Sequence, residues 1–193
     1  MRRRLLFPAA AAAALSLALS ACKDAPEPSA APAASTPVSI DAIAAEAQGF
    51  SLGATMSART AYVFFDPQCP HCAALWTAAR PLRTQSRFVW IPVGILGEKS
   101  ATQGAALLAA TDPVAAMDQH EASLREKGGG IGPRGGTEPQ QEAVKRNTAL
   151  FTRLGFASVP TVVARHAQSG EVVTIEGSLP APALAQRLGL QAP

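Results

Sequence analysis

The sequence predicts an α/β fold with an inserted block of helices, and three observations predict it. An apolar run of strand type, residues 61–65, is followed by a helical stretch and a second apolar strand. A helix-rich stretch then spans about residues 100–154. A hairpin and a helix close the chain. This order of elements indicates an α/β sandwich with a helical insertion.

Each predicted element has a local signal. Apolar runs indicate the strands, and capping residues and glycines mark the helix ends, with Ser39 or Asp41 as the first N-cap and Gly49 as the first stop. Pro81 predicts a bend or break because proline lacks the N–H that a helix interior requires. In chain order, the expected elements are a helix at 41–48, a strand at 61–65, a helix from about 69 to 87, a strand at 88–95, helices within 100–154, strands at 161–164 and 172–175, and a helix at 182–188.

The helical block has its own boundary signals. The expected N-caps are Ser100, Asp112 before Pro113, and Thr137 in a Thr-Glu-Pro-Gln pattern that resembles a capping box. Residues 128–136 hold six glycines in nine positions. This composition predicts a mobile connector between two of the helices.

The first 21 residues have the architecture of an export signal. Three arginines precede an apolar run from Leu5 to Leu19 that is too short for a comfortable membrane span. Leu19-Ser-Ala-Cys22 resembles a bacterial lipobox, which predicts that Cys22 is lipidated and becomes the new N-terminus. The alternative is a secretory signal with a chance cysteine. Lysine directly after Cys22 favours the outer membrane over the inner one.

Residues 22–39 comprise the lipidated cysteine and a tether that is rich in proline and alanine. Such a composition predicts a semi-extended spacer that separates the domain of residues 40–193 from the membrane surface. Removal of residues 1–21 leaves 14 basic and 14 acidic residues, so the net positive charge of the whole chain belongs to the signal. The charge therefore gives no support to a nucleic-acid partner.

The predicted chemistry lies in the motif Cys69-Pro70-His71-Cys72. The motif follows a strand and begins a helix, so unpaired N–H groups and the helix dipole stabilise a thiolate at Cys69. Protonated His71 adds a positive charge beside Cys69, while Pro70 suits the first helical position and stiffens the turn. Cys69 is predicted to attack or to be attacked, and Cys72 to resolve the mixed disulfide.

Three other interpretations compete with a redox pair. A zinc site needs more ligands, but the remaining cysteine is Cys22, and His120 and His166 show no ligand spacing. Haem attachment needs a histidine after the second cysteine, where this chain has alanine. A structural disulfide of this ring size constrains little chain entropy. The redox pair is favoured, with no metal and no cofactor other than its own disulfide.

The residues around the motif form a longer pattern. Phe-Phe-Asp-Pro-Gln-Cys-Pro-His-Cys is followed by Leu-Trp-Thr-Ala-Ala-Arg-Pro, and the pattern continues through residues 100–123 to Val159-Pro160. It resembles the DsbG branch of the periplasmic DsbC/DsbG thiol:disulfide interchange proteins over roughly residues 60–190. The resemblance implies a thioredoxin fold with an inserted helical subdomain. It also implies a cis Val159-Pro160 bond opposite the active site, beside which a substrate strand would pair.

The sequence departs from that family in two respects. The family's isomerases carry an N-terminal dimerisation domain and a long linker helix, whereas only the tether and one short helix precede the first strand here. A monomer is therefore expected. In addition, the dipeptide Pro70-His71 and the valine at Val159 resemble the oxidase DsbA more than the isomerases.

Several side chains near the motif have open roles. Thioredoxins place a buried carboxylate six residues before the first cysteine, where this chain has Val63. Asp66 is then the candidate proton acceptor for Cys72, with a loop cap as its alternative role. Trp76 is either an aromatic wall of the active site or part of the core. The two histidines outside the motif, His120 and His166, are expected to be solvated.

These features together predict a periplasmic, lipid-anchored thiol:disulfide oxidoreductase. It would reduce or isomerise disulfides, or reduce sulfenic acids, in exported proteins, with a DsbD-like membrane protein as its electron donor. The first alternative is a DsbA-like dithiol oxidase that donates its disulfide and is reoxidised by a DsbB-like enzyme. The others are a substrate-holding chaperone without enzymatic activity and a metal carrier.

Overall fold

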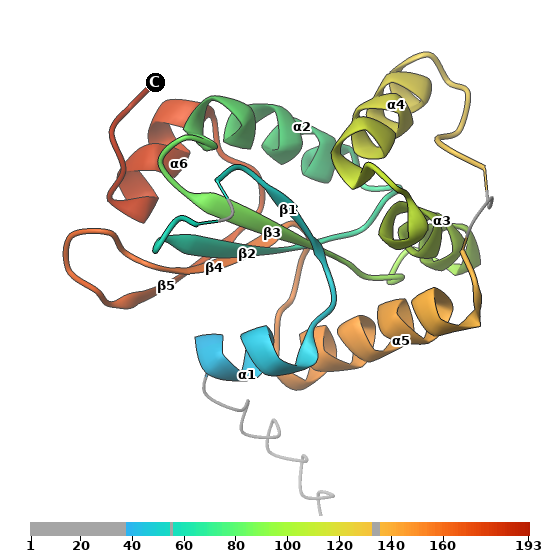
Figure 1. The fold of residues 1–193 in the computed structure, drawn as a ribbon, viewed down its shortest axis with the longest axis horizontal. Helices are drawn as coiled ribbons and strands as arrows, with labels where there is room; N and C mark the ends of the chain where they lie inside the picture. The colour runs from blue at the N-terminus through green and yellow to red at the C-terminus, as the bar shows by residue number, and fades with distance from the viewer. Residues whose placement is uncertain (1–37, 55, 133–135) are drawn as a thin grey trace, which may run out of the picture. The chain divides into compact units, whose positions relative to one another are not determined.

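A mixed sheet of five strands lies between helices in the computed structural model, which describes residues 38–54, 56–132 and 136–193 (Figure 1). The strands, in the spatial order β1-β3-β2-β4-β5, are β1 (Phe50–Leu52), β3 (Arg87–Pro92), β2 (Thr60–Phe65), β4 (Thr161–Arg165) and β5 (Val172–Glu176). The helices are α1 (Ile40–Glu46), α2 (Pro70–Ala79), the 3-10 helix η1 (Arg80–Leu82), α3 (Glu98–Ala109), α4 (Pro113–Arg125), α5 (Glu138–Arg153) and α6 (Ala181–Leu188).

The strand pairing confirms the predicted order of elements. β2 and β3 are parallel, with Val63 opposite Trp90, and α2 connects them along the chain. β4 and β5 form the predicted antiparallel hairpin, with Val162 opposite Ile175. The helices α3, α4 and α5 lie between β3 and β4 in the chain, so the predicted α/β class with a helical insertion is confirmed.

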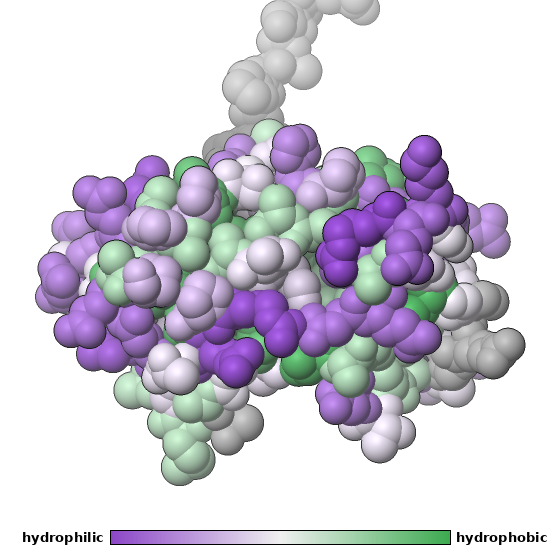
Figure 2. Space-filling model, turned by 90° about the horizontal axis from the view of Figure 1, so that it is seen from above, coloured by the Kyte–Doolittle hydropathy of each residue, from purple (hydrophilic) through white to green (hydrophobic). Residues whose placement is uncertain are grey.

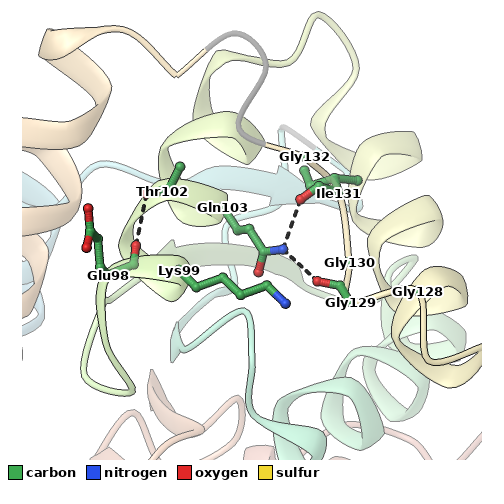
Figure 3. Close-up of a pocket in the computed structure, with 9 residues that line it drawn as sticks. All are labelled: Glu98, Lys99, Thr102, Gln103, Gly128, Gly129, Gly130, Ile131 and Gly132. Atoms are coloured by element: carbon green, nitrogen blue, oxygen red, sulfur yellow. Dashed lines mark hydrogen bonds between the residues drawn. The ribbon is translucent and has the colours of Figure 1, made fainter.

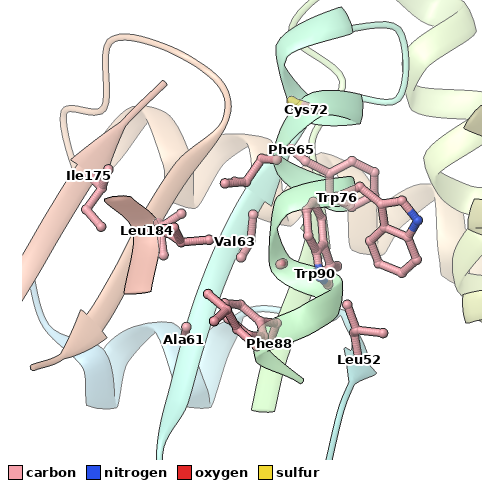
Figure 4. Close-up of a cluster of buried hydrophobic side chains, with 14 of the residues drawn as sticks. Leu52, Ala61, Val63, Phe65, Cys72, Trp76, Phe88, Trp90, Ile175 and Leu184 are labelled. Atoms are coloured by element: carbon pink, nitrogen blue, oxygen red, sulfur yellow. The ribbon is translucent and has the colours of Figure 1, made fainter. Parts of the chain in front are cut away.

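Alternate residues of the central strands pack against two different helical layers. This alternation follows from the two-residue period of a β-strand. The layer that contains α2 and α6 covers a cluster that includes Val63, Phe65, Trp90, Val162 and Leu184 (Figure 4). The layer that contains α1 and α5 covers a second cluster that includes Tyr62, Phe64, Ile91, Val163 and Ile43. Because β2 is buried on both faces, its C-terminal end is fixed where the Cys-x-x-Cys motif begins.

Two of the predicted N-caps are confirmed. The Ser39 hydroxyl accepts a hydrogen bond from the N–H of Ala42 at 3.2 Å and begins α1. The Asp112 carboxylate accepts one from the N–H of Ala115 at 3.0 Å and begins α4, with proline at the first position. Both caps satisfy N–H groups that the first turn of a helix leaves unpaired.

Of the other two predicted caps, Ser100 is wrong, whereas Thr137 is the N-cap of α5 but does not form the predicted capping box. α3 begins after Gly97, whose φ of +119° favours glycine, so Ser100 lies inside the helix and is buried. α5 begins directly after Thr137, but the Thr137 hydroxyl donates to the side chain of Gln140 instead of accepting a backbone N–H. The helix starts there without the expected capping box.

The predicted break near Pro81 is confirmed, because α2 ends at Ala79 and continues as the 3-10 helix η1. The edge strand β1 is not among the predicted elements, since three residues are too few for a periodic pattern. A Cβ at Gly49 would lie 2.4 Å from the carbonyl oxygen of Trp90. Glycine at position 49 therefore permits β1 to approach β3, while α1 ends earlier, with Ala47 as its C-cap.

The predicted signal and the tether up to position 37, including Cys22, lie outside the described residues. Within the described part of the chain, no helix is both long and apolar enough to span a membrane.

Candidate redox-active site

Cys69 is placed by the end of β2 and the start of α2. Its N–H donates to the carbonyl oxygen of Asp66 at 3.0 Å, and its own carbonyl accepts the N–H of Cys72 at 3.0 Å. Cys69 is the N-cap of α2, and Pro70 occupies the first turn, as predicted. Both cysteines are free thiols in this structure.

The surroundings of Cys69 lower the pKa of its thiol to about 6. The largest cause is a side-chain hydrogen bond with Cys72, which favours the thiolate. Burial opposes it, and the backbone N–H groups of Cys72 and His71 add to the lowering. The charge of His71, an exposed residue, contributes least of these causes. The Cys72 side chain and the backbone N–H groups of the first helical turn therefore matter more for the thiolate than the charge of the histidine that the sequence emphasises.

Cys72 has the opposite tendency. Its side chain is fully buried, and burial is the main cause that raises the pKa of its thiol. The hydrogen bond with Cys69 and the negative charges of Cys69 and Asp66 raise it further. One cysteine is thus prepared as a thiolate and the other retains its proton.

The loop before β4 lies beside Cys69. The Val159–Pro160 bond is cis, in agreement with what the family resemblance implies. The thiol of Cys69 donates to the carbonyl oxygen of Val159 at 3.6 Å across a sequence separation of 90 residues. This contact brings the backbone of the loop to the reactive sulfur.

Asp66 is buried under the turn that leads to Cys69. One carboxylate oxygen accepts the N–H of Gln68 and the other the N–H of Leu96, both at 2.9 Å. The carboxylate therefore joins the end of β2 to the loop between β3 and α3. These bonds correspond to the loop-capping role expected as the alternative for Asp66.

Trp76 is a core residue, with 2% of its surface exposed. Its ring centroid lies 4.9 Å from that of Trp90 in an edge-to-face arrangement (Figure 4). Its indole N–H donates to the carboxylate of Asp118 on α4 at 2.8 Å, and Arg80 pairs with the same carboxylate. Trp76 thus connects the active-site helix to the inserted helices.

The expectation that His120 is solvated is wrong, because its side chain is fully buried. Its Nδ1 accepts the N–H of Ile131 at 3.1 Å, so its Nε2 carries the proton and donates to the carbonyl oxygen of Pro67 at 2.7 Å. Burial lowers the pKa of His120, which favours this neutral tautomer. His166, by contrast, is half-buried near the β4–β5 hairpin.

A second contact from the insertion reaches the same turn. The side-chain amide of Gln103 donates to the carbonyl oxygens of Gly129 at 2.8 Å and Ile131 at 2.9 Å, at the wall of a pocket (Figure 3). Its oxygen accepts from Gln68, directly before Cys69. Hydrogen bonds thus join positions 128–131 of the predicted connector to α3 and α4; positions 133–135 are outside the described residues.

Sequence reasoning missed the buried polar residues of the insertion. Met117, His120 and Glu121 follow a spacing of three and four that places them on one helix face, and all three are buried. That spacing was a usable signal, because an apolar residue on the same face indicates burial. Gln103 has a comparable signal, because it shares a helix face with Ser100 and the apolar Leu107, which are also buried.

Comparison with known proteins accounts for this arrangement. A family model described as a thioredoxin-like domain matches residues 54–192. The chain belongs to the thioredoxin-like family. The expected thioredoxin fold with inserted helices is thereby confirmed.

Curated relatives of this thioredoxin-like chain agree with the resemblance seen in the motif. The thiol:disulfide interchange protein DsbG of Pseudomonas aeruginosa is 32% identical over 136 residues, which are 68% of this chain and 51% of the relative. DsbG of Escherichia coli is 33% identical over 105 residues, 52% of this chain and 41% of the relative. The chain spans about half the length of the curated relatives it matches.

Solved structures show the same thioredoxin-like fold. The catalytic domain of Proteus mirabilis ScsC superposes with a TM-score of 0.60 at 18% identity, covering 77% of this chain and 96% of that one. A thioredoxin-like oxidoreductase from Silicibacter pomeroyi gives 0.61 at 20% identity, with 79% and 96% covered. In the described part of the chain, no group of three or more His, Cys, Asp or Glu side chains is placed to bind a metal ion.

Proposed function

We propose that this chain is a thiol:disulfide oxidoreductase that acts on exported proteins through Cys69 and Cys72. The observation that carries the proposal is the opposite behaviour of the two thiols at the start of α2. The pKa of Cys69 is lowered to about 6, whereas burial raises the pKa of Cys72. A nucleophile and a resolving thiol need this division, because only a thiolate attacks a disulfide.

The reductive direction proceeds in two exchanges. The Cys69 thiolate attacks one sulfur of a substrate disulfide, forming a mixed disulfide and releasing the other substrate sulfur as a thiolate. Cys72 then loses its proton and attacks the sulfur of Cys69, which releases the second substrate thiolate and leaves the Cys69–Cys72 disulfide. Two electrons pass from the cysteine pair to the substrate. Sulfenic acids would be reduced by the same two sulfurs, with water as the leaving product.

The second exchange requires a group that accepts the proton of Cys72. The negative charge of the buried Asp66 is one of the causes that raise the pKa of Cys72, and this supports Asp66 as the acceptor. An Asp66→Asn variant would then accumulate the mixed disulfide, because attack by Cys72 is slowed. Rapid acid quench followed by gel separation of the trapped complex measures this accumulation.

The substrate is expected to lie along the loop before β4. The Val159 carbonyl already faces the Cys69 sulfur, and an extended peptide would pair with the backbone of Val159 and its neighbours. Ile95 and Leu96 are exposed and follow β3. The N–H of Leu96 donates to the carboxylate of Asp66, which places this loop beside the turn before Cys69. Ile95 and Leu96 offer apolar contact to an unfolded segment.

The direction of electron flow has two candidates. The DsbG relatives favour reduction or isomerisation, with a DsbD-like donor. The low pKa of Cys69 favours the oxidase, because it stabilises the reduced form and makes the disulfide a stronger oxidant. The thiol state in intact cells decides between them. Acid quench and alkylation would find mostly thiols in a reductase, and mostly disulfide, unchanged when the membrane reductant is removed, in an oxidase.

A chaperone function would depend on binding of unfolded proteins at the protein surface, not on the two cysteines. On the face seen in Figure 2, hydrophilic and hydrophobic residues are interspersed. Holding of unfolded proteins by a chaperone would survive the double replacement Cys69→Ala and Cys72→Ala, whereas exchange activity would not. Aggregation assays on both proteins separate the two functions.

The proposed location is the periplasm, with a lipid at Cys22 and the tether of residues 22–39 as a spacer. The sequence signals at residues 1–22 and the DsbG relatives support this placement. We propose a monomer in the outer membrane. Radiolabelled fatty acid should enter the wild type and not a Cys22→Ser variant, and membrane fractionation then distinguishes the outer membrane from the inner one.

A further inference from the structure

The inserted helix α4 brings a buried carboxyl group to the start of α2. Asp118 contacts Trp76 and Arg80 in the later part of α2 and in η1, whereas His120 contacts Pro67, before α2 begins. These contacts place α4 against α2 and the turn that precedes it (Figure 1). Moving along α4 from Asp118 to Glu121 therefore leads toward the N-terminal end of α2, where the reactive cysteine lies.

Glu121 has an unusual environment for a carboxyl group. Only 2% of its surface is exposed, and both carboxyl oxygens are buried without a hydrogen bond from any described residue. A buried and unsolvated carboxyl group favours its neutral form, and the pKa of Glu121 rises to about 7. Burial is the main cause.

The charged groups around Glu121 come from three sides. Arg125, on α4 itself, lowers the pKa of Glu121, and the Cys69 thiolate raises it. From α3, Lys99 acts on the neighbouring His120, which is neutral. β1 packs against α4 and contributes no titratable residue. The group whose charge changes during thiol–disulfide exchange is therefore Cys69.

We propose that Glu121 is a positioning residue of the redox site that acts through Cys69: the Cys69 thiolate favours its neutral form, and Glu121 ionises at lower pH when Cys69 enters a disulfide. This inference rests on the proposed function. When the pair is oxidised, two electrons pass to the substrate disulfide, and Cys72 and Glu121 each release a proton. When the pair is reduced, both protons return. Above neutral pH, ionised Glu121 repels the thiolate and destabilises the dithiol form.

The redox equilibrium with glutathione at two pH values tests this inference. In Glu121→Gln the repulsion is absent, so at pH 8.5 the equilibrium should shift toward the dithiol by about threefold to tenfold relative to the wild type. At pH 5.5, where Glu121 and much of Cys69 carry protons, the two proteins should agree. Glu126→Gln, which removes an exposed carboxylate at the end of the same helix, is the matched control and should agree with the wild type at both pH values.

The outcomes separate the two proposals. An equal shift at both pH values, or no shift at either, would assign Glu121 a merely structural role and overturn the inference. If neither the wild type nor the variant equilibrates with glutathione, the proposed function itself fails.

A second measurement needs no substitution. The carboxyl carbon of Glu121, followed by NMR in isotope-labelled wild-type protein, should titrate at a lower pH in the disulfide form than in the dithiol form. Identical midpoints in the two redox forms would contradict the coupling, even if Glu121→Gln does not fold.

Discussion

Two regions build the candidate site, and they differ in how they do so. The turn before α2, with the first turn of the helix, determines the reactivity of Cys69 through hydrogen bonds between residues that are close in sequence. The insertion, α3 and α4, acts on the same turn from far along the chain, through Gln103 on Gln68 and His120 on Pro67. Reactivity is thus local, whereas the position of the reactive turn depends on tertiary contacts.

This comparison has a practical meaning for experiments on this chain. A Cys-x-x-Cys motif at the start of a helix supplies the thiolate chemistry by itself. The inserted helices then determine how rigidly that helix start is supported and what charge surrounds it. Changes in the first region should alter exchange chemistry, and changes in the second should alter stability or the response to pH.

The largest effect is expected from Cys69→Ser, which removes the attacking sulfur. Exchange activity in an insulin reduction assay should fall on the order of 10³-fold or more, because the reaction has no other nucleophile. The free energy of unfolding should change little, since the two side chains have similar size. Residual activity near that of the wild type would show that the first region does not carry the chemistry.

The next effect is expected from His120→Ala, in the second region. It leaves the carbonyl of Pro67 and the N–H of Ile131 without their partner, which should cost about 2–3 kcal/mol of unfolding free energy in urea at pH 7.5. His71→Ala, which truncates an exposed histidine, is the control and should be near neutral in stability. A loss of exchange activity without a loss of stability would contradict the division between the regions.

Lowering the pH should remove from the wild type part of the unfolding free energy that His120→Ala removes. Because the pKa of His120 is lowered by folding, the unfolded chain binds the proton more readily. The stability contributed by His120 is therefore complete above its unfolded pKa of about 6.5 and is lost as the pH falls below it. Urea unfolding at pH 7.5 and pH 5 should show this loss, and His120→Ala should lack that component.

A smaller effect is expected from Cys72→Ala, within the first region. The side-chain hydrogen bond from Cys72 is the largest cause of the low pKa of Cys69, so its removal should raise that pKa toward the ordinary value. The alkylation rate at pH 6 should fall about threefold to tenfold. His71→Ala should change it less, because the charge of His71 is a weaker cause. The reverse ranking would make the histidine the main determinant.

The smallest loss of stability is expected from Trp76→Phe at the contact between the regions. One aromatic ring is retained, but the bond from the indole N–H to Asp118 is lost and the smaller side chain leaves a cavity beside Trp90, at a combined cost of about 1–2 kcal/mol. Thermal or urea unfolding measures the change. A cost of several kcal/mol would show that the link between α2 and α4 is stronger than one hydrogen bond.

The same division explains what the sequence could predict. Ser39, Asp112 and the start of α2 follow from contacts within four residues, so local patterns were sufficient for them. Pro81 predicted the break after α2 for the same reason. Ser100 misled because glycine, with its freedom of φ, begins α3 three residues earlier.

The contacts that the sequence did not reveal share a physical cause. His120 and the connector at 128–132 are surrounded by polar residues in sequence, yet each is the other's partner once the chain folds. Whether a polar residue is solvated depends on contacts that one chain segment does not contain. Asp66 and Trp76 were singled out from the sequence, but their partners, Leu96 and Asp118, are 30 and 42 residues away.

The bonds of the glycine-rich segment have a consequence for the timescale of motion at the site. The N–H groups of Gly130 and Ile131 donate to Ser123 and His120, so hydrogen exchange there requires these bonds to open. His120 also donates to the carbonyl oxygen of Pro67. Slow exchange at the Ile131 amide would therefore report how often the contacts of His120 with the turn before Cys69 open. Hydrogen exchange at the amides of Gly130 and Ile131 thus reports on the stability of the contacts that support the reactive end of α2.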